Sequence, residues 1–353
     1  MTAEAQSLLL PLEGARAAAR RPLIQSLGFD SVFFLCSPLV TLPLALLPLL
    51  IAPQLALLFF LLAFPHYAST FAFYFWDENR ERHVTRWFAF FAGPVIIAIA
   101  YWALFYFKVP RLMQLVLFVW NVYHVGRQSC GIVSIYRHRA GVMDNAAKQS
   151  TNFAILAANF AFAFFNIDSH PQFGPFLRDI SPRATALLQS VLAVTALVAL
   201  AGLGKSIWER IKVGKKPLAP ELIFITTSIA IFHPYLWLRS SGMATAMMLL
   251  PHYLQYLGIV WLLHRRRFRT AEGSMGQRTL QRLSTNMPLL LLVLAGIGAS
   301  FAIASVVLRH TGHDTIFETM YLMLAFEHFY LDGLFWAFKD PSVRKSIGPW
   351  LTR

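Results

Sequence analysis

Long apolar blocks dominate this sequence, and short polar segments separate them. A membrane helix needs about 20 mostly apolar residues to cross the hydrocarbon core of a bilayer. Ten blocks approach or exceed this length, and the fifth is the shortest. They are Ser31–Ile51, Gln54–Trp76, Trp87–Phe107, Leu112–Tyr136, Thr151–Phe165, Ala184–Leu203, Pro220–Leu238, Ser241–Leu263, Met287–Leu308 and Ile316–Phe338. The pattern predicts an all-α fold, a polytopic transmembrane helical bundle of about ten spans.

The composition and the placement of charge agree with this topology. Of the 353 residues, 57% are hydrophobic and 14% are charged, which is unusual for a soluble domain. If the N-terminus is cytoplasmic, the inner segments hold 24 of the 31 Lys and Arg residues, the outer loops hold 6, and Arg127 lies inside a span. Cytoplasmic loops of membrane proteins carry such an excess of positive charge. The net charge of +14 is therefore interpreted as contact with lipid headgroups, and not as nucleic-acid binding.

One membrane domain accounts for most of the chain. We expect a cytoplasmic segment over residues 1–30, a transmembrane domain over residues 31–338 and a cytoplasmic tail over residues 339–353. The first apolar block is too long for a cleavable signal, and Cys36 and Cys130 lie in spans and predict no disulfide. The expected location is a bacterial inner membrane. The sequence does not indicate an oligomeric state.

Four histidines lie inside predicted spans, where ionisable side chains are costly and usually functional. His66, His124, His252 and His328 stand 12, 12, 11 and 12 residues from the expected outer ends of spans two, four, eight and ten. At 1.5 Å per residue this depth is about 17 Å, near the bilayer midplane. If the four helices pack around one centre, the imidazoles can converge there.

A shared metal ion is the chemistry that these histidines favour. Neutral imidazole binds iron, copper and zinc, and its second N–H usually donates to an amide or a carboxylate. Amide side chains share the helix faces of His124 and His252, and tyrosines directly follow two of the histidines. These expected partners of the rings are Asn121, Gln128, Gln255, Tyr67 and Tyr253. The donor set favours non-haem iron, with copper, zinc or haem as alternatives.

Three charged residues lie near the histidines in the sequence. Arg127 is three residues after His124, Glu327 precedes His328, and Asp332 is four residues after His328. An unpaired Arg in a membrane costs at least about 2.5–3.5 kcal/mol, so we predict that Arg127 forms an ion pair with Asp332 or Glu327. The three residues are candidate catalytic groups that position a polar substrate group or carry protons.

An internal repeat also involves the histidines. Pro65-His66-Tyr67 and Pro251-His252-Tyr253 have the same sequence, and each is followed two spans later by another histidine in the same layer. This pattern indicates a possible duplication of spans one to five as spans six to ten, as in other membrane folds.

Two short segments resemble the Brp/Blh family of integral-membrane carotene-cleaving dioxygenases. The Pro-His-Gly motif of that family is similar to Pro65-His66-Tyr67. Its His-Phe-Gly-Glu/Gln motif is similar to His124-Val125-Gly126-Arg127-Gln128, with one residue inserted. The family carries two histidines four residues apart on a later helix, whereas Tyr256 stands four residues after His252 here. The resemblance implies a multi-span bundle, an iron site of four histidines and a lipophilic substrate.

Several functions remain open at this point. The first is an oxygenase that uses non-haem iron on a lipophilic substrate, such as a carotenoid or another lipid. The second is a membrane cytochrome with haem held between pairs of histidines. The third is a proton-coupled transporter, since buried His, Arg, Glu and Asp also relay protons. The last is a structural protein, although interhelical hydrogen bonds in membranes average only about 0.6 kcal/mol.

Overall fold

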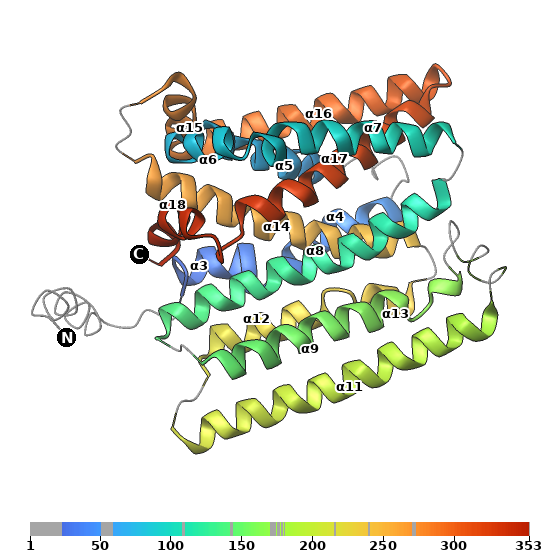
Figure 1. The fold of residues 1–353 in the computed structure, drawn as a ribbon, viewed down its shortest axis with the longest axis vertical. Helices are drawn as coiled ribbons and strands as arrows, with labels where there is room; N and C mark the ends of the chain where they lie inside the picture. The colour runs from blue at the N-terminus through green and yellow to red at the C-terminus, as the bar shows by residue number, and fades with distance from the viewer. Residues whose placement is uncertain are drawn as a thin grey trace, which may run out of the picture.

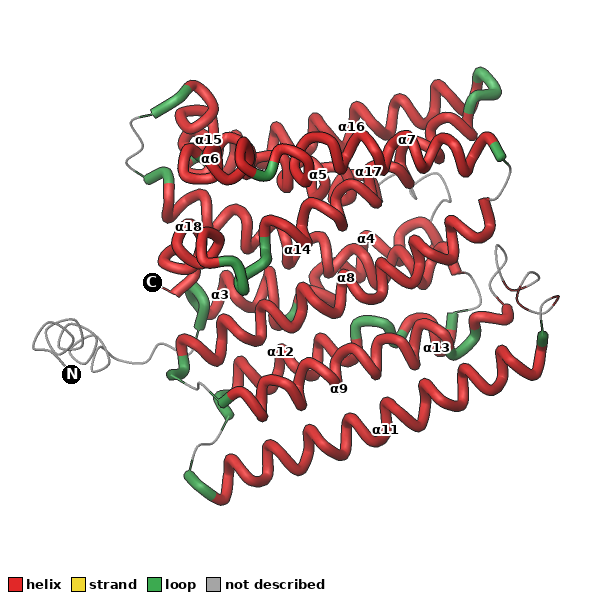
Figure 2. Tube along the Cα trace, in the orientation of Figure 1, coloured by secondary structure: helices red, strands yellow, loops and turns green. Residues whose placement is uncertain are grey.

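The described part of the protein is helical throughout. The computed structural model describes residues 23–50, 59–107, 110–141, 144–169, 181–214, 217–238, 241–269 and 273–352, with three isolated positions between residues 170 and 180. Every regular element in these ranges is a helix (Figure 2). The all-α prediction is confirmed for them. Most of the predicted N-terminal segment, residues 1–22, lies outside the described residues, as do residues 51–58 in the first two predicted spans.

Each of the ten predicted blocks contains helix. The principal helices are α4 (Ser37–Leu50), α5 (Phe60–Phe71), α7 (Gly93–Tyr106), α8 (Pro110–Arg139), α9 (Asn145–Phe164), α11 (Pro182–Lys212), α12 (Ala219–Ala230), α14 (Ser241–Arg267), α16 (Met287–His310) and α17 (Asp314–Phe335). Shorter elements join or extend them: α3 (Leu27–Asp30), α6 (Asp77–Thr85), α13 (Pro234–Trp237), α15 (Met275–Thr285), α18 (Pro341–Thr352), the π-helical η1 (Ser31–Leu35) and η4 (Phe88–Ala92), and the 3-10 helical η3 (Ala72–Phe75) and η5 (Ile167–Ser169).

Two of the predicted blocks are bent or broken. The first bends by 52° where η1 meets α4. Just before the third block, α6 meets η4 and α7 at 87°. The seventh block is broken between α12 and α13, where Pro234 has no amide hydrogen to continue the helix.

Among the described residues, three helices are long and apolar enough to cross a membrane: Pro182–Lys212, Met243–Arg267 and Met287–His310. The number rises to five if each bent pair of helices is counted as one span. The first pair joins α3 and η1 to α4, and the second joins α6 to η4 and α7. Helix α8 is longer than two of the three, with 30 residues, but it carries the polar residues around His124. These findings indicate a membrane protein.

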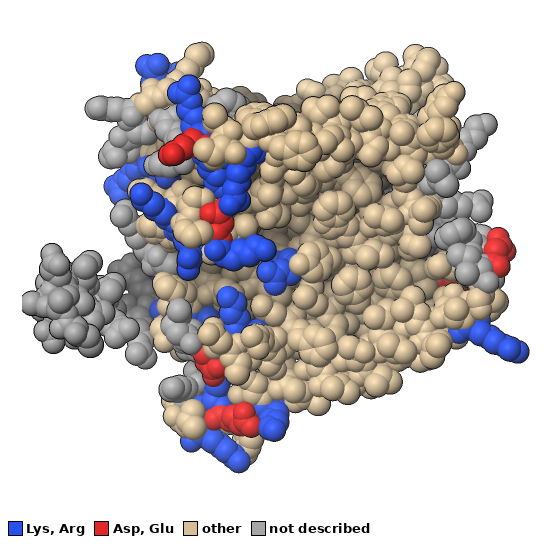
Figure 3. Space-filling view, viewed as in Figure 1, with Lys and Arg blue, Asp and Glu red and all other residues tan. Residues whose placement is uncertain are grey.

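The charged side chains gather at one end of the bundle. In Figure 1 the long helices lie side by side, with α11 at one edge against α9. Lys and Arg cluster at the end where α8, α11 and α14 finish, and a broad band free of charged residues covers the middle of the visible face (Figure 3). Such a distribution is what an apolar belt between two polar ends requires.

Two apolar clusters fill the interior, and the histidine layer lies between them. One cluster contains Phe64, Val122 and Met248 and extends toward the N-terminal ends of α5, α8 and α14. The other contains Val133 and Leu263 and extends toward the opposite ends of the helices. The polar layer is thus enclosed by apolar packing on both sides.

The expected C-terminal tail forms a helix that packs on the bundle. Val343, Ile347 and Leu351 of α18 are buried. Asp340, just before α18, forms ion pairs with Arg82 and Arg86 at 3.2 and 3.1 Å. The chain after α17 is therefore fixed to α6 by charge and to the bundle core by apolar contacts.

Candidate metal centre

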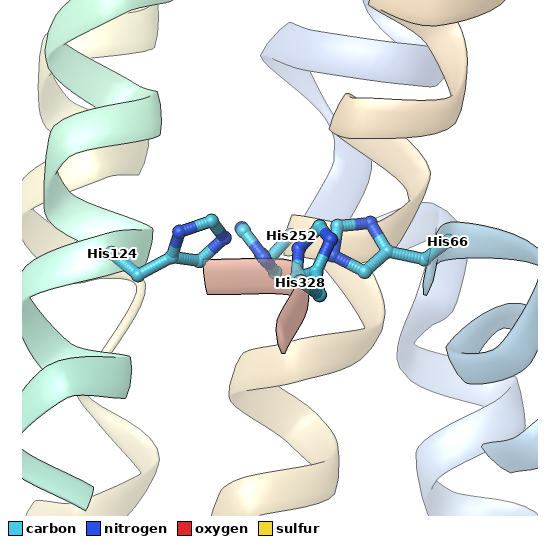
Figure 4. A group of neighbouring side chains, drawn as sticks. All are labelled: His66, His124, His252 and His328. Carbon is cyan, nitrogen blue, oxygen red and sulfur yellow. The ribbon is translucent and has the colours of Figure 1, made fainter. Parts of the chain in front are cut away.

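Four histidines meet inside the bundle, each from a different helix. His66 comes from α5, His124 from α8, His252 from α14 and His328 from α17, and Figure 4 shows the rings converging on one point. Each ring contributes one nitrogen to the centre, and these four nitrogens all lie within 4.8 Å of one another. The side chains are 0%, 8%, 1% and 0% exposed, respectively. The predicted convergence of these histidines is confirmed.

Most of the ring nitrogens have no hydrogen-bond partner within the described part of the chain. The unpartnered, buried atoms are both nitrogens of His66, both nitrogens of His252, Nε2 of His124 and Nε2 of His328. A buried polar atom without a partner costs about 1–3 kcal/mol, so six such atoms in one cluster would be strongly unfavourable. A bound cation would remove much of this cost, because one lone-pair nitrogen of each ring would then have a partner.

The spacing of the nitrogens fits a single metal ion. Ring nitrogens bind zinc, and similar ions, at about 2.1 Å, so two nitrogens on opposite sides of an ion lie about 4.2 Å apart. The observed limit of 4.8 Å therefore requires the rings to close by about half an ångström. Small rotations of the side chains supply a movement of that size.

The two Pro-His-Tyr segments face each other across the centre. The ring centroids of His66 and His252 are 4.9 Å apart, and the hydroxyls of Tyr67 and Tyr253 are 3.3 Å apart. Each proline lies inside its helix, where it leaves the carbonyl four residues earlier without its helical amide partner. The internal repeat in the sequence thus becomes a pair of adjacent helices, α5 and α14.

The tyrosines that follow the histidines make a cluster of phenol groups. The hydroxyl of Tyr67 donates to that of Tyr321 at 3.2 Å, and the hydroxyls of Tyr253 and Tyr321 are 3.5 Å apart. The ring of Tyr253 lies 4.6 Å from that of His66, centroid to centroid. The tyrosines predicted beside the rings therefore pack against them. Their hydroxyls bond to one another, and Tyr321 is a member of the cluster that the sequence did not indicate.

Thr70 fixes the protonation of one histidine. Its hydroxyl lies 2.8 Å from Nδ1 of His328 and donates to Oδ1 of Asp332 at 3.1 Å. Because a hydroxyl has one proton and an ionised carboxylate only accepts, Thr70 accepts from an N–H at Nδ1. Nε2 of His328 then carries the lone pair toward the centre, as a metal ligand requires.

Two of the three amide side chains predicted to bind the rings have other partners. Gln128 donates to the backbone carbonyl of His252 at 3.1 Å, and Gln255 donates to the Ser37 hydroxyl at 2.9 Å. Asn121 is buried, and its side-chain oxygen has no partner among the described residues. The amides therefore hold the helices around the centre, while Thr70 makes the hydrogen bond to a ring.

The predicted ion pair of Arg127 with Asp332 or Glu327 is wrong. Arg127 is exposed on α8, Glu327 is half-buried, and neither takes part in an ion pair within the described residues. The reason is the helical phase. At about 100° per residue, Asn121 and Gln128 lie to one side of His124 and mark the inward face, whereas Arg127 lies about 60° to the other side. Asp332 instead faces the histidines, with Oδ2 3.9 Å from Nε2 of His124.

Comparisons with models of protein families, with curated proteins and with solved structures found no match for this chain. The functional argument therefore rests on the residues of the centre and their surroundings.

Proposed function

We propose that this protein is an integral-membrane oxygenase in which His66, His124, His252 and His328 hold non-haem iron. The observation that carries the proposal is the convergence of four buried imidazoles with unpartnered nitrogens. Imidazole ligands suit iron, copper and zinc. Iron is preferred because, when bound, it supplies the activation of dioxygen, and dioxygen concentrates in the apolar interior of a membrane. The two short motifs similar to those of the carotene-cleaving dioxygenases support the same choice.

The proposed topology has ten spans and places both termini in the cytoplasm of a bacterial cell. Its support is the excess of basic residues in the segments that would face inward. The charged end of the molecule in Figure 3 would then meet the inner leaflet. In this arrangement the histidine layer lies near the middle of the bilayer, where lipophilic substrates dissolve.

A lipophilic substrate is supported by an apolar cavity beside the centre. The cavity has a volume of about 230 Å³ and lies between η1, α4, α12 and α14. Cys36, Ala230, Met247 and Pro251 are among its lining residues, and Pro251 is covalently joined to His252. We propose that an apolar part of the substrate, such as a polyene chain or an acyl chain, binds here.

The side chains around the centre would each have a defined part in the proposed reaction. Thr70 holds His328 in the tautomer that presents Nε2 to the centre. The apolar clusters on both sides exclude water from the histidine layer, which protects reactive species from side reactions. The hydroxyls of Tyr67, Tyr253 and Tyr321 are the nearby groups able to donate a hydrogen bond to a polar atom of the substrate.

The geometry argues against a haem between these histidines. Axial imidazoles bind haem iron from opposite faces, and four porphyrin nitrogens occupy the plane between them. Here the ring of His66 is 4.3 Å from that of His328, and the ring of His124 is 5.0 Å from it, centroid to centroid. The additional histidines fill the positions that a porphyrin would need.

The direct test is oxygen consumption by purified, iron-loaded protein in lipid vesicles that contain a carotenoid, with analysis of the products. We expect consumption coupled to cleavage or oxidation of the carotenoid or of another lipid in a small panel. His252→Ala should abolish it, whereas His313→Ala, which changes an exposed histidine, should have no effect. Iron-loaded protein that consumes no oxygen with any member of the panel would refute the oxygenase.

A further inference from the structure

A second layer of polar residues lies one helical turn below the histidines. Thr70, Tyr256 and Asp332 each stand four residues after a histidine, on α5, α14 and α17. They are 0%, 3% and 5% exposed. The Thr70 and Tyr256 hydroxyls are 2.8 Å apart, and Tyr256 donates to Oδ1 of Asp332 at 2.7 Å. Since three helices contribute one member each, this layer fixes the carboxylate in place under the centre.

The carboxylate presents its second oxygen to the histidines. Both hydrogen bonds, from Thr70 and Tyr256, go to Oδ1. Oδ2 lies 3.7 Å from Nε2 of His328 and 3.9 Å from Nε2 of His124. Those separations are too long for hydrogen bonds, and the proton of His328 is on Nδ1. Neither contact is therefore explained by the protein alone.

The separations between Oδ2 and the two ring nitrogens are similar to those between two ligands of one metal ion. Nitrogen and oxygen ligands lie at about 2.0–2.2 Å from zinc and similar ions. Two of them are then about 3 Å apart at a right angle and about 4.2 Å apart on opposite sides. The distances of 3.7 and 3.9 Å to the nitrogens of His328 and His124 fall within this range. The set of ligand atoms that lie within 4.8 Å of one another contains the four histidines and not Asp332, so Oδ2 must move toward the other two rings to complete the donor set.

Charge leads to the same conclusion. A buried carboxylate needs a cation or several hydrogen bonds to balance the loss of hydration. Arg127, which the sequence offered as the partner, is exposed and takes part in no ion pair with Asp332. The described contacts of Asp332 are the hydroxyls, the rings and Trp336. These neutral donors stabilise the carboxylate without balancing its charge, and a divalent ion among the histidines would balance it.

We infer that Asp332 is a fifth ligand of the metal centre, through Oδ2, so that the donor set is four imidazoles and one carboxylate. This inference rests on the metal centre proposed above. A hard anionic oxygen favours iron, manganese or zinc and disfavours copper(I), which prefers soft ligands. The carboxylate also closes the side of the centre that faces the C-terminal ends of the helices. An exchangeable ligand would then approach from the side of Tyr67 and Tyr253.

Cobalt(II) substitution tests this assignment, because a thiolate bound to cobalt gives an intense near-ultraviolet charge-transfer band. The full-length protein is purified in detergent, stripped of metal and titrated with cobalt(II). Wild type should bind about one ion and show no such band, since neither Cys36 nor Cys130 belongs to the group of ligand atoms at the centre. Asp332→Cys should show the band. The neighbouring control Glu327→Cys, at a position on another face of α17, should not.

A second variant measures how much the carboxylate contributes. Asp332→Asn keeps the shape and an oxygen for Thr70 and Tyr256, but it loses the charge. We expect cobalt binding at least about 10-fold weaker, since even groups that only hydrogen-bond to ligands contribute about 10–100-fold. Absence of the band in Asp332→Cys, while wild type binds cobalt, would overturn the assignment and leave the four-histidine centre standing. Failure of wild type to bind cobalt would overturn both.

Discussion

Gly298 on α16 sets the distance between α16 and α5, the helix that carries His66. A Cβ at Gly298 would lie 2.7 Å from Cα of Leu61 and 2.9 Å from the carbonyl oxygen of Phe60. Favourable carbon–carbon contacts lie at about 3.5–4.0 Å, and the atoms in the way belong to the backbone. Gly298→Ala must therefore push the two helices apart by about 1 Å.

The expected cost of that movement is about 1–3 kcal/mol, the usual effect of overpacking. Because ligands must be held within about 0.5 Å of their working positions, displacement of α5 should also weaken metal binding through His66. The assay is thermal unfolding in detergent together with cobalt titration. Gly296→Ala is the matched control: it lies two residues away on the same helix, is exposed, and a Cβ there has no neighbour within 4 Å.

Gly296→Ala should keep wild-type metal binding and be neutral or slightly stabilising, because alanine favours helix by up to about 1 kcal/mol over glycine. The reasoning is refuted if Gly298→Ala and Gly296→Ala have the same stability and the same metal affinity. Loss of stability in Gly298→Ala with unchanged metal affinity would show that α5 gives way without moving His66.

Three further predictions concern other parts of the molecule. Glu221 is buried and accepts hydrogen bonds from Arg137 and Arg210, both at 2.7 Å. Glu221→Gln should destabilise the protein by about 3–5 kcal/mol, because it leaves two buried cations uncompensated. Equal unfolding temperatures for wild type and Glu221→Gln would contradict this prediction. Burial alone would raise the pKa of Asp340. Hydrogen bonds from Ser342 and the positive charges of Arg82 and Arg86 outweigh burial and lower this pKa. The stabilisation by Asp340 should thus be complete above about pH 4 and be lost as pH falls further, so the gap in unfolding temperature between wild type and Asp340→Asn should close in acid; a gap that widens in acid would be inconsistent with this sign. Ala230→Trp should fill much of the apolar cavity and raise the KM for a long-chain substrate without changing iron content; an unchanged KM would place the substrate elsewhere.

The helical fold and the four ligands could be predicted from sequence because each leaves a periodic or costly signal. Apolar blocks of membrane length mark the helices, and a histidine at the same depth in four of them stands out against that background. The break at Pro234 follows from the proline itself, which has no amide hydrogen. The π-helical turns at Phe88–Ala92 could not be predicted, since they depend on local packing.

The surroundings of the ligands were harder to predict, and the errors have a physical cause. The cost of an unpaired Arg predicts a partner for Arg127 in Asp332 or Glu327, but the helical phase set by Asn121 and Gln128 turns Arg127 outward. Thr70 and Tyr256 carried a usable signal, because each stands four residues after a histidine, as Asp332 does. Tyr321 lies seven residues before His328, and the contact that brings it to Tyr67 depends on how α5 packs against α17.

The central claim is tested most directly by the metal content of wild-type protein expressed with iron supplied and purified in detergent, with a visible spectrum of the same sample. We predict about one iron per chain and no Soret band. Single alanine substitutions of His66, His124, His252 and His328 should each lower the iron content, and His313→Ala should retain it. Wild-type protein without bound metal, or iron that survives all four substitutions, would contradict the four-histidine centre.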